Sequence, residues 1–415
     1  MKKYLLIIAI LLPVMLNAQT QWQWRGENRN GMYNETGLLK EWPAKGPELL
    51  WSFEGLGEGH TSVAIANGNI YISGMHDDRL ILYVFDMNGN LLTEKEIGKE
   101  WNTSWNGTRS SACINDGKLY IFNALGTLFC LDETTLQEVW KKDLIAEYDG
   151  RNLMFGMTEN PLIVGDKLFM TPGGEQHNMV ALNKHTGELI WTSPGTGMLS
   201  SYCSPLYISE QAIPMVVTWM ATLPVQGAPR NMMYDNVLAA FHAETGELLW
   251  TQPQPSTNTI NPNMPMYIDG MIFSVTGYGG GAWLNRLKDG GKTVELVWEN
   301  SEMDNQMGGA IKVGDYLYAS GHQNRNWFCV DWKTGETKYM VPDIAPCNVI
   351  FADGMLYCYS ERGTMNLVKP NPDKFELVSS FDVTLGTEQH WAHPVIHNGV
   401  LYLRHGDALM AYKVK

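Results

Sequence analysis

The chain has 415 residues and a formal net charge of −14 at pH 7, with 41 glycines and 11% aromatic residues. This acidic balance argues against a general nucleic-acid-binding role, which needs a basic surface. Many glycines together with many aromatic side chains are typical of short strands joined by tight turns.

The first 18 residues resemble a secretory signal. Two lysines precede an apolar run over residues 4–16, and the small residue Ala18 is followed by Gln19 at an expected cleavage site. The apolar run is short for a membrane span, and no cysteine follows it to accept a lipid. We therefore expect a soluble periplasmic or secreted protein that begins near Gln19.

A degenerate repeat runs along the rest of the chain. Its clearest copies read ETTLQEVW (133–140), HTGELIW (185–191), ETGELLW (244–250) and KTGETKY (333–339). Each copy places a tight turn before a short alternating stretch that ends in Trp or Tyr, as in a half-buried strand. The repeats recur at about the length of one four-stranded blade, which predicts a propeller.

A second family of turns predicts the number of blades. Seven copies, among them ANGN (66–69), NDGK (115–118) and HNGV (397–400), precede aromatic and β-branched strands, and SEQA (209–212) takes the same place in an eighth unit. Eight hairpins predict an all-β fold, an eight-bladed β-propeller of four-stranded antiparallel blades.

The ends of the repeat predict how the ring closes. The last unit stops at ALMAYKVK (408–415), one strand short of a blade, and ELLWSF (48–53) resembles the missing outer strand. Pairing of these N-terminal and C-terminal strands would leave no open edge. We expect one propeller domain over residues 48–415 and an extension, residues 19–47, strapped across one face of it.

The Trp-ended repeats over residues 48–415, preceded by QWRGENRNG (23–31), resemble the PQQ-like β-propeller repeat proteins. That family includes quinoprotein alcohol dehydrogenases and a lipoprotein scaffold of outer-membrane-protein assembly. The dehydrogenase resemblance implies two adjacent cysteines and a set of calcium and quinone ligands, none of which is evident here. We therefore expect no cofactor, neither PQQ nor calcium.

The six cysteines do not form a metal-binding or disulfide pattern. Most of them lie within predicted strands among apolar neighbours, and no CxxC pair exists. We expect buried free thiols and no metal site.

Side chains suited to chemistry concentrate on one face of the predicted propeller. The turns between first and second strands and between third and fourth strands define a turn face, and the long irregular loops define the opposite, long-loop face. Arginine recognises carboxylates, and histidine and tyrosine move protons. The predicted catalytic residues on the long-loop face are His60, His177, Tyr202, His322 and His393. The predicted substrate-binding residues are Arg79, Arg109, Arg325, Trp101 and Trp283.

Three functions fit this arrangement. In the first, an exported enzyme of lyase or hydrolase type binds an acidic oligosaccharide, or another small anionic ligand, in the central funnel. In the second, the propeller is a non-catalytic module that binds a glycan or a protein. In the third, which rests on the resemblance, the protein is a PQQ-dependent alcohol dehydrogenase. We favour the first over the second, because seven histidines on one face exceed what a scaffold needs.

Overall fold

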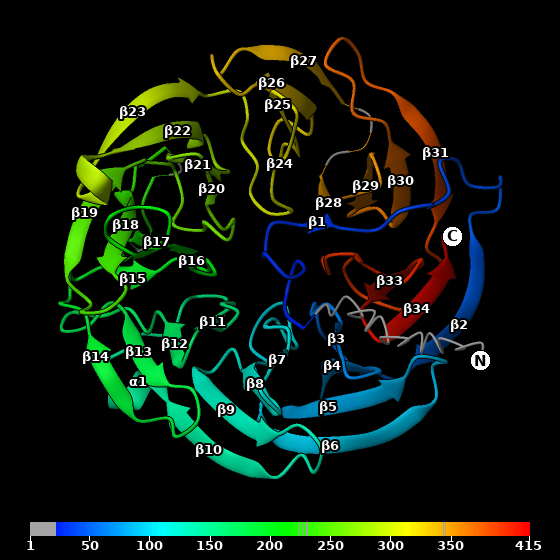
Figure 1. Ribbon diagram of the computed structural model, residues 1–415, viewed down its shortest axis with the longest axis horizontal. Helices are drawn as coiled ribbons and strands as arrows, with labels where there is room; N and C mark the ends of the chain where they lie inside the picture. The colour runs from blue at the N-terminus through cyan, green and yellow to red at the C-terminus, as the bar shows by residue number, and fades with distance from the viewer. Residues whose placement is uncertain (1–21, 224, 226, 230, 343, 345) are drawn as a thin grey trace, which may run out of the picture.

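The computed structural model describes residues 22–415 except 224, 226, 230, 343 and 345. The described residues form eight sheets arranged in a ring, which confirms the predicted eight-bladed propeller (Figure 1). The expected signal over residues 1–18 lies outside the described part of the chain. Within that part, no helix is both long and apolar enough to cross a membrane.

The blades follow one another along the chain, and the strands of each blade are given below from the innermost to the outermost. Blade 1 consists of β3 (Ala64–Ala66), β4 (Asn69–His76), β5 (Arg79–Asp86) and β6 (Leu91–Lys99). Blade 2 consists of β7 (Cys113–Asn115), β8 (Lys118–Phe122), β9 (Thr127–Asp132) and β10 (Glu138–Asp143). Blade 3 consists of β11 (Leu162–Val164), β12 (Lys167–Met170), β13 (Val180–Asn183) and β14 (Leu189–Thr192). Blade 4 consists of β15 (Leu199–Ser200) and β16 (Leu206–Ile208), which both pair with β17 (Met215–Ala221), followed by β18 (Asn236–His242) and β19 (Leu248–Pro253).

The second half of the ring repeats this order. Blade 5 consists of β20 (Met266–Ile268), β21 (Met271–Thr276), β22 (Gly281–Lys288) and β23 (Thr293–Asn300). Blade 6 consists of β24 (Ile311–Val313), β25 (Tyr316–Ser320), β26 (Trp327–Asp331) and β27 (Thr337–Val341). Blade 7 consists of β28 (Cys347–Ala352), β29 (Met355–Ser360), β30 (Thr364–Val368) and β31 (Leu377–Asp382), and β1 (Met32–Tyr33) pairs with the inner edge of β28. Blade 8 consists of β32 (Val395–His397), β33 (Val400–His405), β34 (Ala408–Lys413) and β2 (Glu48–Glu54). The short helices are α1 (Leu144–Glu147) and η1 (Asp289–Gly291).

The ring closes through blade 8. Strand β2 pairs antiparallel with β34, from Glu48 opposite Lys413 to Glu54 opposite Ala408. This pairing confirms the predicted closure by the N-terminal and C-terminal strands, and it removes the edge that an open last blade would expose.

The Trp-ended repeat docks each blade on the next. Trp140, at the end of one copy, donates from Nε1 to the carbonyl of Lys184 in the next blade at 3.1 Å. Gly187, in the turn of the next copy, has a φ of +72°, and a Cβ there would lie 2.8 Å from Cδ2 of Trp140. The glycine thus permits both the turn and the close approach of the indole ring.

The cysteines behave as predicted from their apolar neighbours. All six are buried free thiols. They occupy core positions, where a thiol acts as a small hydrophobic side chain.

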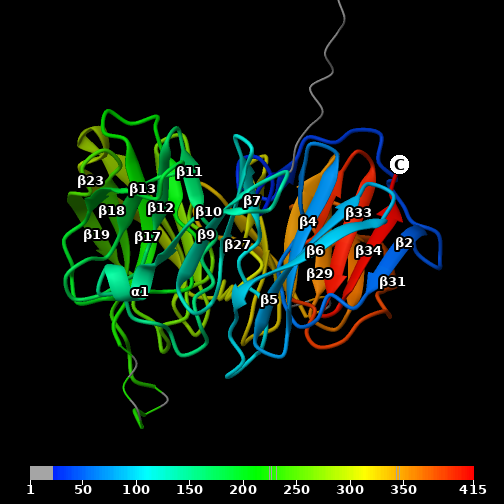
Figure 2. The same ribbon diagram turned by 90° about the horizontal axis from the view of Figure 1, so that it is seen from below.

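The N-terminal extension crosses the turn face and enters the centre of the ring (Figures 1 and 2). The carbonyl of Trp22 accepts a hydrogen bond from the Ile114 amide of blade 2 at 2.8 Å, and β1 runs parallel to β28 of blade 7. Further along, Glu35 accepts from the Asn398 amide at 2.6 Å, and Trp42 is buried in the hydrophobic core. We call residues 22–33 the strap, because they span the channel from blade 2 to blade 7.

Candidate functional site

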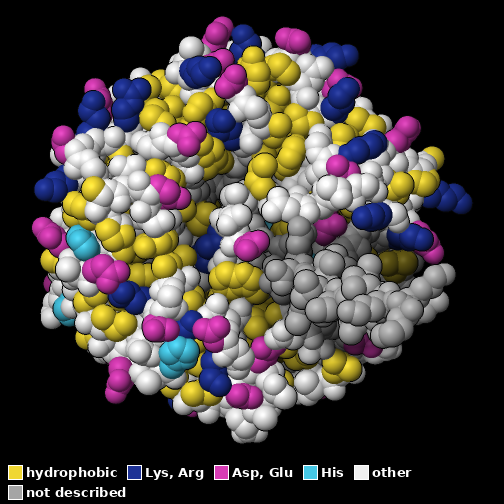
Figure 3. Space-filling view, in the orientation of Figure 1, with side chains coloured by type: hydrophobic (Ala, Val, Ile, Leu, Met, Phe, Trp, Pro, Cys, Tyr) yellow, Lys and Arg dark blue, Asp and Glu magenta, His cyan; other side chains and the backbone are white. Residues whose placement is uncertain are grey.

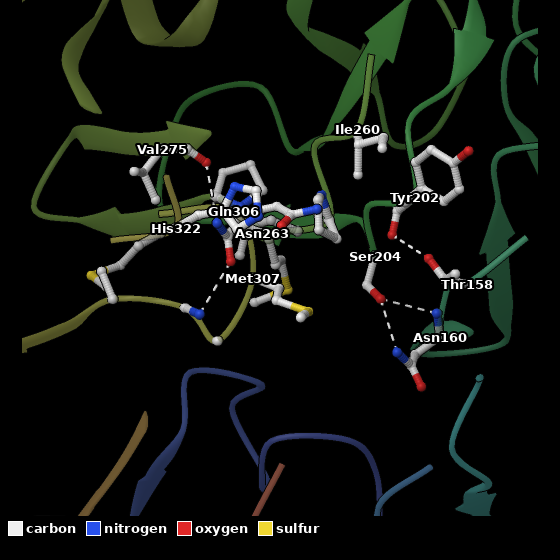
Figure 4. Close-up of a pocket in the computed structure, with 18 of the residues that line it drawn as sticks. Thr158, Asn160, Tyr202, Ser204, Ile260, Asn263, Val275, Gln306, Met307 and His322 are labelled. Carbon is white, nitrogen blue, oxygen red and sulfur yellow. Dashed lines mark hydrogen bonds between the residues drawn. The ribbon is translucent and has the colours of Figure 1, made fainter. Parts of the chain in front are cut away.

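The centre of the ring contains a cavity of about 1240 Å³. Its walls are the strap, the innermost strands of blades 4 to 6, and several long loops. Figure 4 shows part of this wall, with side chains from blades 3 to 6 around one space. Large concave sites with a few convergent polar groups are the usual location of ligand-binding sites.

A belt of polar side chains links neighbouring blades where the innermost strands begin. The Ser62 amide donates to Oγ of Ser111 at 2.9 Å, and the Ser111 amide donates to Oδ1 of Asn160 at 2.7 Å. The Asn160 amide donates to Oγ of Ser204 at 2.9 Å, and Asn263 Oδ1 accepts from the Gly309 amide at 3.1 Å (Figure 4). These bonds pair backbone amides at the starts of the innermost strands, and they link each of these blades to its neighbour.

Sequence reasoning missed this belt, although the sequence carries a signal for it. A polar residue followed by proline precedes an apolar strand in NPL (160–162), SPL (204–206) and HPV (393–395), each time ahead of the first turn of a blade. A polar residue at the same place in three of the eight units indicates a shared position near the axis of the ring.

Two arginines of the strap lie in the channel, and both are almost completely buried. Arg25 donates from Nη1 to the carbonyl of Gly308 at 3.3 Å and lies 3.2 Å from Nδ1 of His393. Arg29 donates to the carbonyls of Asn160 and Pro161 at 3.1 and 2.7 Å. Neither guanidinium forms an ion pair with a carboxylate among the described residues. Burial lowers the pKa of each to about 10, so both remain cationic at neutral pH.

The strap arginines were not among the predicted site residues. The motif QWRGENRNG was recognised only as part of the resemblance, because a segment outside the repeats has no period that would place it at the axis. Both arginines adopt positive φ angles, 61° for Arg25 and 56° for Arg29. Such a backbone costs energy for a residue with a side chain, and here it turns the guanidinium groups into the channel.

One wall of the cavity mouth combines His60 with two tryptophans. The His60 ring centroid lies 4.9 Å from that of Trp391, which in turn lies 5.2 Å from that of Trp105. Both ring nitrogens of His60 are buried, and neither has a hydrogen-bond partner among the described residues. Burial, together with the charges of Arg109 and Arg404, lowers the pKa of His60 to about 3. His60 is therefore a neutral imidazole with an unused donor and an unused acceptor.

Arg109 stands beside this wall and is partly occupied by its own loop. It donates from Nη1 to the Gly107 carbonyl at 2.7 Å, from Nη2 to the Ser104 carbonyl at 3.0 Å, and to the Trp105 carbonyl. Burial lowers its pKa to about 10, while nearby Glu100 raises it. Burial also raises the pKa of Glu100 to about 7, so this carboxylate only partly offsets the charge of Arg109 at neutral pH. Arg109 keeps one Nη1 hydrogen and its Nε hydrogen for a ligand.

The opposite wall carries Tyr202, Tyr278 and His322. The Phe155 amide donates to Oη of Tyr202 at 3.4 Å, which leaves the Tyr202 hydroxyl proton free. The Tyr278 ring centroid lies 4.9 Å from that of His322, and Gln306 donates to Oη of Tyr278 at 3.1 Å. Burial lowers the pKa of His322, and its Nδ1 has no partner among the described residues. Each wall thus offers a neutral histidine with spare hydrogen-bonding capacity, and the second wall adds the free hydroxyl proton of Tyr202.

The structure brings half of the predicted site residues to this one cavity. Those that line it are His60, Arg109, Tyr202, His322 and His393. They come from blades far apart in sequence and meet because each lies at or near the start of an innermost strand or in a long loop.

The other predicted residues do not line the cavity. Arg79 lies on the surface between Asp77 and Glu96, at 3.6 Å from each carboxylate. His177 Nδ1 lies 3.4 Å from the carbonyl of Ser193, and Trp101 donates to the carbonyl of Ser104 at 2.9 Å. Arg325 is exposed, and Trp283 lies on β22, the third strand of its blade. Assignment to the long-loop face did not separate inner from outer positions, so these five side chains do not share the cavity with the other five.

The donor set gives no support to a metal-assisted cofactor. No group of three or more His, Cys, Asp or Glu side chains among the described residues is arranged to hold a metal ion.

Comparison with known proteins identifies the family. The family model of PQQ-like repeats described as outer membrane protein assembly factor BamB matches residues 78–214 and 161–371. Because these matches together span more than half of the chain, the protein belongs to this family of PQQ-like repeat propellers, which confirms the resemblance read from the repeats.

Curated relatives are distant and longer. The chain is 26% identical over 169 residues to quinoprotein alcohol dehydrogenase PedH of Pseudomonas putida, which covers 40% of this chain and 27% of that protein. It is 25% identical over 263 residues to a quinoprotein ethanol dehydrogenase of Pseudomonas putida, 56% of this chain and 40% of that protein. A tetrathionate hydrolase of Acidithiobacillus ferrooxidans is 24% identical over 177 residues, 40% of this chain and 32% of that protein. The chain thus spans less than half the length of these relatives.

Solved structures agree on the fold. A europium-containing methanol dehydrogenase superposes with a TM-score of 0.69 at 12% identity, over 94% of this chain and 91% of that one. BamB from Moraxella catarrhalis superposes with a TM-score of 0.60 at 13% identity, over 89% of this chain and 98% of that one. An enzyme and an assembly factor share this fold, so function has to be argued from the cavity.

Proposed function

We propose that this propeller binds an anionic cyclic ligand in its central cavity, with a uronate-containing saccharide as the preferred class. One observation carries the proposal. The buried guanidiniums of Arg25 and Arg29 and the half-buried guanidinium of Arg109 border one cavity, and none of the three has a carboxylate within ion-pair distance among the described residues. An acid group on a ligand would supply the missing counter-charge in a site of low dielectric, where that interaction is strong.

The walls explain why the ligand should be cyclic. Trp105, Trp391 and Tyr278 offer flat apolar surfaces beside the polar groups, an arrangement that suits the face of a sugar ring. The predicted binding residue Arg109 would hold the carboxylate. Trp101 and Trp283, also predicted, would have no part, because neither lines the cavity.

The same groups are suited to a β-elimination. The carboxylate of a bound uronate would raise the lowered pKa of His60, and the imidazole would then remove the proton next to that carboxylate. Arg109 would stabilise the negative charge that develops on the carboxylate. The C–O bond one carbon further would break, and the leaving oxygen would take the hydroxyl proton of Tyr202. The step balances without an oxidant, because His60 takes the proton from carbon and Tyr202 supplies the proton for the leaving oxygen.

Calorimetry with paired ligands tests the proposal. An oligoglucuronate should bind, and the neutral oligoglucoside of the same length should not. Arg109→Gln should weaken binding at least tenfold, whereas Arg79→Gln, an arginine change outside the cavity, should leave it unchanged. Equal binding of acidic and neutral ligands would contradict the proposal.

Turnover is measured separately. Formation of the unsaturated uronate should be followed by its ultraviolet absorbance, with His60→Gln as the variant expected to bind and not react. Binding without any product in the wild type would leave a non-catalytic binding module.

A further inference from the structure

The strap fills only one side of the central channel. On that side the innermost strands are covered: β3 and β32 are completely buried, and β28 is buried apart from Phe351. On the other side all three residues of β20 are half-exposed, and so are Leu206 and Tyr207 of β16. The cavity is therefore the part of the channel that the strap leaves open, along blades 4 to 6.

This open side reaches both faces of the propeller. At the long-loop face the cavity begins at Trp105, Trp391 and Glu361. At the turn face it ends at Glu210, in the first turn of blade 4, and at Lys312 of β24. Figure 3, which views the turn face, shows a hollow near its centre bordered by hydrophobic side chains. One space thus connects the two ends of the channel.

The two ends differ in chemistry. The long-loop end carries Arg109 and the histidines described above. Beyond the polar belt, the wall is made mainly of apolar side chains: Leu206, Tyr207, Met264, Met266, Tyr267 and Ile268. Half-exposed methionines and aliphatic side chains in a cavity offer adaptable apolar contact to a ligand.

Size and polarity together define the ligand. Cavities of about 300–1,000 Å³ hold drug-sized ligands, and this one, at about 1240 Å³, is larger than a single sugar needs. We propose that the ligand is an elongated amphipathic anion, with its acidic sugar head between His60 and Arg109 and an apolar tail along β16 and β20 toward the turn face. This inference rests on the proposed function and adds the tail.

Three soluble ligands separate the acid site from the apolar tail: glucuronate, octyl β-glucuronide and octyl β-glucoside. The two octyl glycosides are titrated below their micelle concentrations. Octyl β-glucuronide should bind at least tenfold more tightly than glucuronate, because the tail leaves water for the apolar wall. Octyl β-glucoside should bind at least tenfold more weakly than octyl β-glucuronide.

Matched methionine variants locate the tail. Met266→Gln should reduce the gain from the octyl chain severalfold and leave the affinity for glucuronate unchanged. Met340→Gln, a methionine exposed on the outer strand β27, should change neither. Because Met266 is half-exposed, the polar substitution should leave the fold intact, which the melting temperature checks.

The outcomes are distinguishable. Equal affinity for glucuronate and octyl β-glucuronide would overturn the tail and leave the acid site standing. Equal affinity for the two octyl glycosides, or no binding of either glucuronate compound, would overturn the proposed function and this inference with it. An octyl gain that Met266→Gln does not reduce would also overturn the proposed path.

Discussion

The contact between Gly187 and Trp140 gives the most quantitative prediction about stability. Replacing Gly187 with alanine adds a Cβ that would lie 2.8 Å from the Trp140 ring, at a φ of +72°. Gly68 provides the matched control, since its φ is +78° and no described atom lies within 4 Å of the added Cβ. Both substitutions force alanine into the left-handed region, which costs about 1–2 kcal/mol. Only Gly187→Ala also crowds a buried ring, which adds about 1–3 kcal/mol.

Gly187→Ala should therefore lower the free energy of unfolding by about 2–5 kcal/mol, and Gly68→Ala by about 1–2 kcal/mol. Urea denaturation followed by tryptophan fluorescence measures both, with an unchanged slope indicating that the native state has not changed. Equal losses in the two variants would refute the argument that the repeat glycine is needed for docking between blades.

Four further predictions concern the strap, a buried carboxyl, ring closure and the cofactor. Arg25→Met leaves the carbonyls of Gly308 and Asn30 without their donor, so it should lower the free energy of unfolding by about 1–3 kcal/mol and make the strap sensitive to protease. As the control, substitution of the exposed Arg151 in Arg151→Met should change the free energy of unfolding by no more than about 0.5 kcal/mol. Burial raises the pKa of Glu159 to about 8, so the contribution of Glu159 to stability is greatest below the ordinary carboxyl pKa. That contribution should fall as pH rises toward 8, by up to about 1.4 kcal/mol per pH unit. Denaturation of the wild type and of Glu159→Gln at pH 5, 6.5 and 8 should show this fall only in the wild type, and equal slopes would argue against a neutral Glu159. Deletion of residues 408–415 removes β34 and exposes the edges of β2 and β33, so light scattering should detect aggregation, and a soluble monomeric variant would count against closure as a source of stability. Added PQQ and calcium should not support dye-linked ethanol oxidation, and measurable turnover would restore the dehydrogenase alternative.

The eight-bladed ring could be predicted because the sequence pattern that specifies one blade recurs along the chain. Each blade carries the same turn and strand pattern, so an irregular copy such as SEQA (209–212) is recognised by its neighbours. Closure followed from the same logic, since only a strand like β2 could complete the blade that ends with β34.

The interior of the channel was harder to predict. A loop-to-strand position tells which face a side chain lies on, but not its distance from the axis, so His60 and Arg109 were found together with surface Arg79. Arg25 was missed because the strap has no repeat partner, and its place in the channel depends on contacts with Gly308 and His393, both remote in sequence.

A crystal structure of the protein with a bound oligoglucuronate tests the central claim most directly. The account predicts the ligand in the central cavity, with a carboxylate within hydrogen-bond distance of the Arg109 guanidinium and a sugar ring against Trp391. A ligand bound on the outer surface, or in the cavity with its carboxylates turned away from every arginine, would contradict the account.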